Sequence, residues 1–368
     1  MENEQYLLLE LKRTIEAVIK YKKLDYSTFC SIYTQSEKER RCYKKNALTS
    51  VIHLKEAHPN MRDLYKYRFA MIEEIISLLE SEKIPYAILK GAYLGDIAYG
   101  DLNKRTSNDI DFLITKEYIK AVKSICHKAQ FVAGKSDRKN EKIITYNRNQ
   151  ELAFLLNTHQ ISTMVKVDRN SELGYYDTVI DFNFKVTWGE YKGKEISTEE
   201  FLENVERVTD SNGYIYKVLK PNYFFIQLCL HAYKEANGLF FIYNNNGLML
   251  RAFVDIYFYI CEKNKCLNID NIMEIVNKYE IQSYIYFILY MIRKLFGGND
   301  WLNSMIKRLL SSNCDTEIVN FFGFDKEKTW QNIGVLQRFI PEIVEPFLKK
   351  TLSTEEIDKI MSIREDFY

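Results

Sequence analysis

The spacing of apolar residues changes along the first third of the chain. Residues 61–83 carry apolar side chains at helical intervals beside acidic ones, which predicts a helix that ends before Pro85. A short strand at 86–90 and a short helix at 92–99 follow, and the residues "DIDFLI" at 109–114 again have a strand pattern. The chain therefore enters a strand-helix-strand arrangement after an N-terminal helical part.

Between about residues 130 and 190 the pattern favours short strands, with the candidates "KIITYN", "LAFLLN", "TMVKVD" and "TVIDFNFKV" separated by polar turns. From residue 219 onward the spacing is almost wholly helical. The sequence thus predicts an α+β fold. Its predicted parts are an N-terminal helical segment at 1–83 that packs on the core, an α/β core at 84–215 and a helical C-terminal domain at 216–368.

Composition and charge exclude several classes of protein. With 368 residues and 46% hydrophobic content, the chain is long enough for a globular core. Lys+Arg 51 against Asp+Glu 50 gives no global field that would attract nucleic acid or anionic lipid. The longest apolar run, 284–292, is about half of a bilayer span, and the N-terminus lacks a secretory pattern. Seven cysteines without a C-x-x-C pair fit reduced thiols, so we expect a cytoplasmic protein without a membrane partner.

Two aspartates interrupt the apolar strand at 109–114. Alternation along a strand puts Asp109 and Asp111 on one face and Ile110 and Phe112 on the other. The two carboxylates would lie roughly 6 to 7 Å apart along the backbone, and without a cation their repulsion would raise at least one pKa. Magnesium relieves such repulsion because it binds one or two carboxylates together with substrate phosphates.

A third carboxylate has a similar setting. Asp181 lies opposite the apolar Ile180 and Phe182 in its strand, so it would join the other two aspartates if that strand lies beside 109–114. Three carboxylates around two metal ions about 3.5 to 4 Å apart serve phosphoryl or nucleotidyl displacement. Two alternatives stay open: Asp181 on the wet face of an antiparallel strand, and Asp168 as a rival third carboxylate.

A lysine-glycine turn precedes the aspartates. Gly91 follows a strand and opens a helix, a place where backbone N–H groups can face phosphates, with Lys90 and Arg105 as cationic partners. Lys-Gly after a strand is a weak signal by itself. The basic cluster at 37–45 is more typical of a solvated helix face than of an RNA-binding surface.

Residues 84–114 resemble a family of bacterial uncharacterised nucleotidyltransferases, a branch of the DNA polymerase β-like superfamily. The family pattern is a Leu-Lys-Gly turn, a short helix ending near a Tyr, and an Arg four residues before Asp-Ile-Asp. The matching residues are Leu89, Lys90, Gly91, Tyr99, Arg105, Asp109, Ile110 and Asp111. The resemblance extends to "DFNF" at 181–184 and to two helical segments, where it places His231 and Asp255.

This resemblance implies a minimal nucleotidyltransferase mixed sheet with flanking helices, Mg²⁺ or Mn²⁺ in two sites, and a nucleoside triphosphate substrate. It implies catalytic metal ligands at Asp109, Asp111 and Asp181, nucleotide contacts at Lys90, Gly91, Ala92 and Arg105, and further site residues at Asn183, His231 and Asp255. The chain departs from the family where Ala92 replaces a Ser or Gly and where Asn183 replaces a His, which removes an acid–base role at position 183.

The implied reaction moves a nucleotidyl group to a hydroxyl-bearing acceptor, and a small molecule or a peptide is favoured over nucleic acid. Two alternatives remain. The first is a non-catalytic nucleotide-binding or partner-binding module of the same fold. The second is transfer of a glycosyl or phosphoryl group at the same metal site.

Overall fold

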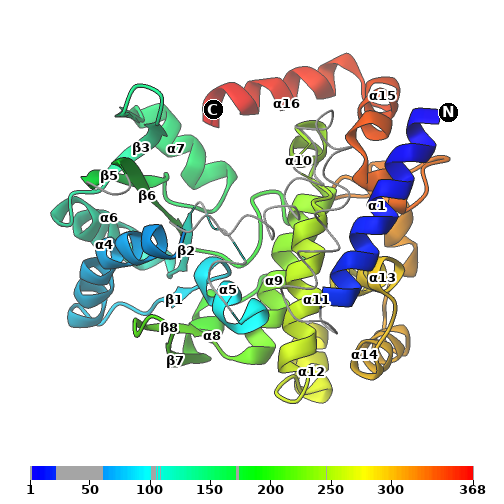
Figure 1. The fold of residues 1–368 in the computed structure, drawn as a ribbon, viewed down its shortest axis with the longest axis horizontal. Coiled ribbons are helices and arrows are strands. Elements are labelled where there is room, and N and C mark those ends of the chain that lie inside the picture. Colours follow the sequence, from blue (N-terminus) through cyan, green and yellow to red (C-terminus); the bar gives the residue numbers. More distant parts are fainter. Residues whose placement is uncertain are drawn as a thin grey trace. The chain divides into compact units, whose positions relative to one another are not determined.

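The structure, a computed structural model, divides the chain into two compact units. It describes residues 2–21, 61–100, 105, 107, 109–170, 174–245 and 247–367. The sheet unit is built on Ala57–Gln227, and the helical unit on Leu228–Glu365 together with helix α1 (Glu2–Tyr21) (Figure 1). The basic segment at 37–45 lies outside the described residues.

One mixed sheet forms the centre of the sheet unit. Within the described residues, eight strands pair in the order β4-β3-β5-β6-β2-β1-β8-β7. The pairs β1–β8 and β2–β6 are parallel, and the other neighbours are antiparallel. The strands are β1 (Ala87–Ile88), β2 (Ile110–Leu113), β3 (Val132–Asp137), β4 (Lys142–Thr145), β5 (Met164–Asn170), β6 (Gly174–Asn183), β7 (Val205–Thr209) and β8 (Ile215–Leu219).

Helices surround this sheet. They are α4 (Met61–Ser81), α5 (Gly91–Tyr99), α6 (Ile119–Lys128), α7 (Arg148–Asn157) and α8 (Thr198–Glu203). Helix α4 packs against α6 and β6, and its apolar stripe supplies this contact. On the apolar face of the sheet, the rings of Phe112 in β2 and Phe182 in β6 stack with centroids 4.9 Å apart, and both are fully buried. A slip of one residue would expose these rings, so their burial fixes the register of the two strands.

One strand prediction was wrong. The residues "LAFLLN" lie in helix α7 rather than in a strand. The helix begins with a capping box, in which the Asn147 side chain accepts from the Gln150 N–H and the Gln150 side chain accepts from the Asn147 N–H. A short apolar run is ambiguous between helix and strand, and these polar caps decide for the helix.

The helical unit is a packed bundle. Its further helices are α10 (Leu239–Tyr243), α11 (Leu250–Lys263), α12 (Ile269–Tyr279), α13 (Gln282–Phe296), α14 (Asp300–Leu310), α15 (Pro341–Thr351) and α16 (Thr354–Phe367), with short strands β9 (Phe321–Phe322) and β10 (Lys328–Thr329). Helix α13 is buried on most of its surface and contacts α1, α11 and α14. It is therefore the centre of this unit.

The predicted α+β class, a mixed sheet together with helical N-terminal and C-terminal regions, is confirmed. The predicted N-terminal segment is divided, because α1 packs in the helical unit whereas α4 belongs to the sheet unit. Helix α9 (Pro221–Asn237) crosses the division between Gln227 and Leu228. Across the parts of the chain that are described, no helix is long and apolar enough to cross a membrane.

Candidate functional site

Two neighbouring parallel strands bring the predicted carboxylates together. Asp111 in β2 is the register partner of Asp181 in β6, so their side chains leave the same face of the sheet in adjacent positions. Asp109 precedes β2 by one residue, two positions before Asp111. The face opposite to Phe112 and Phe182 therefore carries a cluster of three aspartates.

The charges of these aspartates oppose one another. Asp111 is buried, with 4% of its surface exposed, while Asp109 and Asp181 keep partial contact with solvent. Removal from water, followed by the charges of Asp111 and Asp109, raises the pKa of Asp181 to about 7. The Thr163 hydroxyl donates to Asp181 Oδ1 at 2.7 Å, which favours the ionised form and only partly offsets this rise.

Lys90 supplies positive charge to the cluster. Its Nζ lies 3.3 Å from Asp111 Oδ2 in an ion pair, and its charge also lowers the pKa of Asp181. The geometry of that contact is not that of a hydrogen bond, so the buried Asp111 Oδ2 accepts no hydrogen bond from the described residues. A buried carboxylate oxygen without a hydrogen bond is suited to a further cation or donor.

The glycine turn packs beside the aspartates. Gly91 opens α5 with φ +55°, a left-handed conformation that side chains rarely adopt. A Cβ at this position would lie 3.3 Å from the Ser107 hydroxyl, and that hydroxyl donates to Asp109 O at 2.7 Å. Arg105 Nη1 donates to Gly91 O at 2.9 Å. The predicted turn and its cationic partner thus lie together, next to Asp109.

The other predicted residues are spread more widely. Asn183 lies two residues beyond Asp181 and donates to Asp111 Oδ1 at a long 3.4 Å, while Gln160 donates to its Oδ1 at 2.8 Å. The amide is therefore held as a donor toward the cluster. Ala92 lies in the first turn of α5.

His231 and Asp255 belong to the helical unit. His231 in α9 shares a 2.8 Å hydrogen bond with Glu235, and Asp255 in α11 is buried. The rival carboxylate Asp168 pairs with Tyr176 in β6 and accepts from the hydroxyl of Tyr176. Its side chain leaves the face of the sheet opposite to Asp181.

The residues fit a divalent cation that binds together with its substrate. Over the described ranges, no three His, Cys, Asp or Glu side chains are already arranged as a metal-binding group. Magnesium needs no such cage, since it usually takes one or two carboxylates, water and substrate phosphate oxygens. Asp111 Oδ2 accepts no hydrogen bond from the described residues, and the pKa of Asp181 is raised by burial and by the neighbouring carboxylates. Both properties are expected at a site where a bound cation would balance the negative charge of the aspartates.

Sequence reasoning missed the residues that support the cluster. Thr163 and Ser107 lie in polar or mixed segments and gave no signal of their own. Arg68 did give a signal, because in α4 it is four residues before Ile72 and therefore on the apolar stripe. A charged residue at such a position is buried only with partners.

Comparison with known proteins matches the chain to a sequence family. A sequence model of the family described as uncharacterised nucleotidyltransferase matches residues 49–297, more than half of the chain. No curated protein matches. Among solved structures, an antigenic nucleotidyltransferase-like protein from Paracoccidioides brasiliensis is 16% identical, with a TM-score of 0.27, over 59% of this chain and 90% of that one.

Proposed function

Because the chain belongs to the family of uncharacterised nucleotidyltransferases, we propose that it transfers a nucleotidyl group from a nucleoside triphosphate to a hydroxyl-bearing acceptor. The observation that carries the proposal is the pairing of Asp111 with Asp181 across two parallel strands, next to the Lys90-Gly91 turn. Without the strand pairing, Asp181 would have no common site with Asp109 and Asp111, which lie about 70 residues earlier in the chain.

In this proposal Asp109, Asp111 and Asp181 hold Mg²⁺ or Mn²⁺, in one or two sites. A bound divalent ion supplies positive charge that stabilises the transferring phosphoryl group and the leaving pyrophosphate. Lys90 lies close enough to Asp111 to contact phosphate oxygens that bind at the same place. The backbone of the Gly91 turn and Arg105 add donors and positive charge on the nucleotide side.

The residues also provide for the proton that the reaction releases. The acceptor oxygen forms a bond to the α-phosphorus, the bond from that phosphorus to the pyrophosphate oxygen breaks, and the acceptor hydroxyl loses its proton. Asp181 is the proposed acceptor of this proton, because its carboxylate leaves the same face of the sheet as Asp111 and is held there by the Thr163 hydroxyl.

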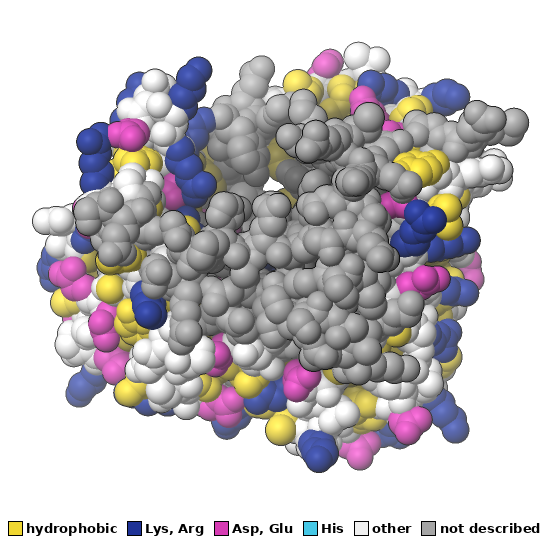
Figure 2. Space-filling model, in the orientation of Figure 1, with side chains coloured by type: hydrophobic (Ala, Val, Ile, Leu, Met, Phe, Trp, Pro, Cys, Tyr) yellow, Lys and Arg dark blue, Asp and Glu magenta, His cyan; other side chains and the backbone are white. Residues whose placement is uncertain are grey.

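The balanced charge of the chain, Lys+Arg 51 against Asp+Glu 50, favours a small molecule or a peptide over nucleic acid as the acceptor. Lys and Arg side chains gather over the part of the sheet unit that carries β3 and β4, at the upper left of Figure 2. Two exposed arginines of the sheet unit form ion pairs: Arg138, directly after β3, with Asp177, and Arg169 in β5 with Glu141.

Nucleotide binding and carboxylate substitution test the proposal. Calorimetry with ATP, GTP, CTP and UTP in the presence of Mg²⁺ should show binding of at least one triphosphate. The double variant Asp109→Ala, Asp111→Ala should lose transfer by on the order of 10³-fold, because a metal ion contributes several kcal/mol of charge stabilisation. Asp168→Asn is the matched control, since it removes a carboxylate from the opposite face and should leave transfer unchanged.

Two results would reject the proposal: a wild-type chain that binds no triphosphate, or a double variant that transfers as fast as wild type. Mass spectrometry of the modified acceptor separates the remaining alternatives. An added nucleotidyl mass supports the proposal, whereas an added phosphoryl or glycosyl mass replaces it. Binding of a triphosphate without any modified acceptor indicates a non-catalytic module.

A further inference from the structure

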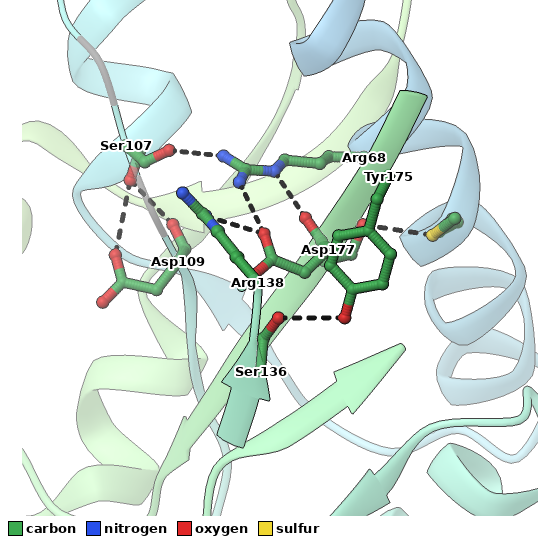
Figure 3. A network of polar contacts seen from close by, with 9 residues as sticks. Arg68, Ser107, Asp109, Ser136, Arg138, Tyr175 and Asp177 are labelled. Atoms are coloured by element: carbon green, nitrogen blue, oxygen red, sulfur yellow. Dashed lines mark hydrogen bonds and ion pairs between the residues drawn. The ribbon is translucent and has the colours of Figure 1, made fainter. Parts of the chain in front are cut away.

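A buried arginine links helix α4 to the candidate site. Only 7% of the surface of Arg68 is exposed. Its Nε donates to Asp177 O at 2.8 Å, its Nη2 donates to Asp177 Oδ1 at 3.1 Å, and its Nη1 donates to Ser107 O at 2.8 Å (Figure 3). One guanidinium thus joins two segments that are 70 residues apart in the chain.

The guanidinium lies just before the first paired residues of β2 and β6. The first paired residues of these parallel strands are Ile110 and Ile180. Continuing the same register by three residues places Ser107 opposite Asp177. Arg68 bridges the carbonyl oxygens of these two residues, and so it takes the place of further ladder hydrogen bonds. The segment that leads into β2 is therefore held to β6 by a side chain.

Ser107, which Arg68 holds, in turn contacts Asp109. The Ser107 hydroxyl donates to Asp109 O at 2.7 Å and reaches Asp109 Oδ1 at 3.4 Å (Figure 3). The charge of Asp109 also acts on the guanidinium of Arg68. A continuous path of polar contacts runs from Asp177 through Arg68 and Ser107 to the aspartate that precedes β2.

The far end of the path is rigid. Asp177 is 2% exposed and also accepts two hydrogen bonds from Arg138, at 3.0 Å from Nε and 2.8 Å from Nη2. A carboxylate that receives two guanidinium groups has little freedom to rotate. Arg68 is thus fixed by Asp177 on one side, and its third hydrogen bond, from Nη1, holds the Ser107 carbonyl.

We propose that Arg68 is a positioning residue, which through Ser107 sets the place of the Asp109 carboxylate and so the affinity of the aspartate cluster for a divalent cation. This rests on the proposed function only in that the cluster binds such a cation. Apolar packing does not require the guanidinium, since a leucine would continue the apolar stripe of α4.

Mn²⁺ binding to the full chain tests this role. Calorimetry or electron paramagnetic resonance gives the dissociation constant for Mn²⁺ without any need for turnover. Arg68→Gln should weaken Mn²⁺ binding by about 10- to 100-fold, as expected when the support of a metal ligand is lost. Arg138→Gln is the matched control: it also removes a guanidinium from Asp177, but Arg138 has no hydrogen bond to Ser107 among the described contacts. The control should weaken Mn²⁺ binding much less than Arg68→Gln does, because it loosens Asp177 but leaves the hydrogen bond from Arg68 to Ser107 in place.

A second variant covers the case in which Arg68→Gln fails to fold. Ser107→Ala keeps the carbonyl that Arg68 binds and removes only the hydroxyl that contacts Asp109. It should weaken Mn²⁺ binding roughly fivefold, the value of one hydrogen bond. In a double-mutant cycle, the combined variant should lose little more affinity than Arg68→Gln alone, because both changes act on Asp109 by one path.

The outcomes separate this inference from the proposed function. A wild-type chain that binds neither Mn²⁺ nor a triphosphate overturns both. A wild-type chain that binds Mn²⁺, with folded Arg68→Gln or Ser107→Ala variants that bind it equally well, overturns the positioning role alone. Strictly additive losses in the cycle also overturn it, since they indicate two independent effects.

Discussion

Asp177 and Asp181 lie on the same face of β6, four residues apart, but their charges meet opposite surroundings. Burial alone would raise the pKa of Asp177, yet hydrogen bonds from Arg138 and Ser136 and the charges of Arg138 and Arg68 lower it. The pKa of Asp181 rises to about 7, because desolvation and two neighbouring carboxylates outweigh Thr163 and Lys90.

This difference separates a structural carboxylate from a candidate catalytic one. The ion cluster around Asp177 is complete within the protein, with more positive than negative charge. In the cluster around Asp181, the charge of Lys90 offsets only part of the negative charge of the three aspartates. A strand can therefore carry two enclosed aspartates, of which only the uncompensated one is suited to binding a cation.

The largest effect is expected from Asp177→Asn. Removing this charge leaves the buried guanidinium of Arg68 without its ion-pair partner, which typically destabilises a protein by about 3–5 kcal/mol. Chemical unfolding of the full chain measures the loss. Arg138→Gln is the control: 61% of the Arg138 side chain is exposed, so its pair should contribute below about 1 kcal/mol. If both variants lose the same free energy of unfolding, the buried Arg68–Asp177 pair does not stabilise the protein more than the exposed Arg138–Asp177 pair, and the prediction is wrong.

Asp181→Asn should increase the free energy of unfolding of the metal-free protein, whereas Asp177→Asn should decrease it. A native pKa of about 7, against about 3.9 in the unfolded chain, means that wild type loses stability as the pH rises from about 4 to about 7. The uncharged variant avoids that loss, so at pH 8 it should be more stable by up to about 4 kcal/mol, an upper limit because solvent reaches the side chain. At pH 4 the two should be alike.

Unfolding at both pH values, with and without Mn²⁺ and nucleotide, checks this second prediction. At 100 times the dissociation constant a ligand adds about 2.7 kcal/mol to the wild type, whereas Asp181→Asn should gain little. If the variant is less stable than wild type at pH 8 without metal, the negative charge of Asp181 does not destabilise the metal-free protein, and the prediction is wrong.

The predictable part of the site came from local alternation. The periodic faces of β2 and β6 placed Asp111 and Asp181 opposite buried rings, and the turn before α5 was expected from Gly91. That β2 and β6 lie side by side could not be predicted, because pairing between distant segments is not encoded in either segment alone. The prediction that Asp181 joins the other aspartates therefore depended on this pairing. The same limit applies to Ser107 and Thr163, whose roles exist only after the sheet has formed.

Thr163→Val should give the smallest effect and the sharpest test of the charge comparison. The hydroxyl donates to Asp181 Oδ1 at 2.7 Å and lowers its pKa, so it performs in part what two guanidinium groups perform for Asp177. Its loss should raise the pKa of Asp181 further. Protons then compete better with Mn²⁺, and affinity at pH 7 should fall roughly threefold, because a pKa rise worth about one hydrogen bond (~1 kcal/mol) reduces the ionised fraction of Asp181 from about one half to about one sixth. Above pH 9, where Asp181 is ionised in both proteins, most of this difference should vanish. A deficit that is the same at pH 7 and pH 9 would mean that Thr163 shapes the site sterically and does not act through the charge of Asp181.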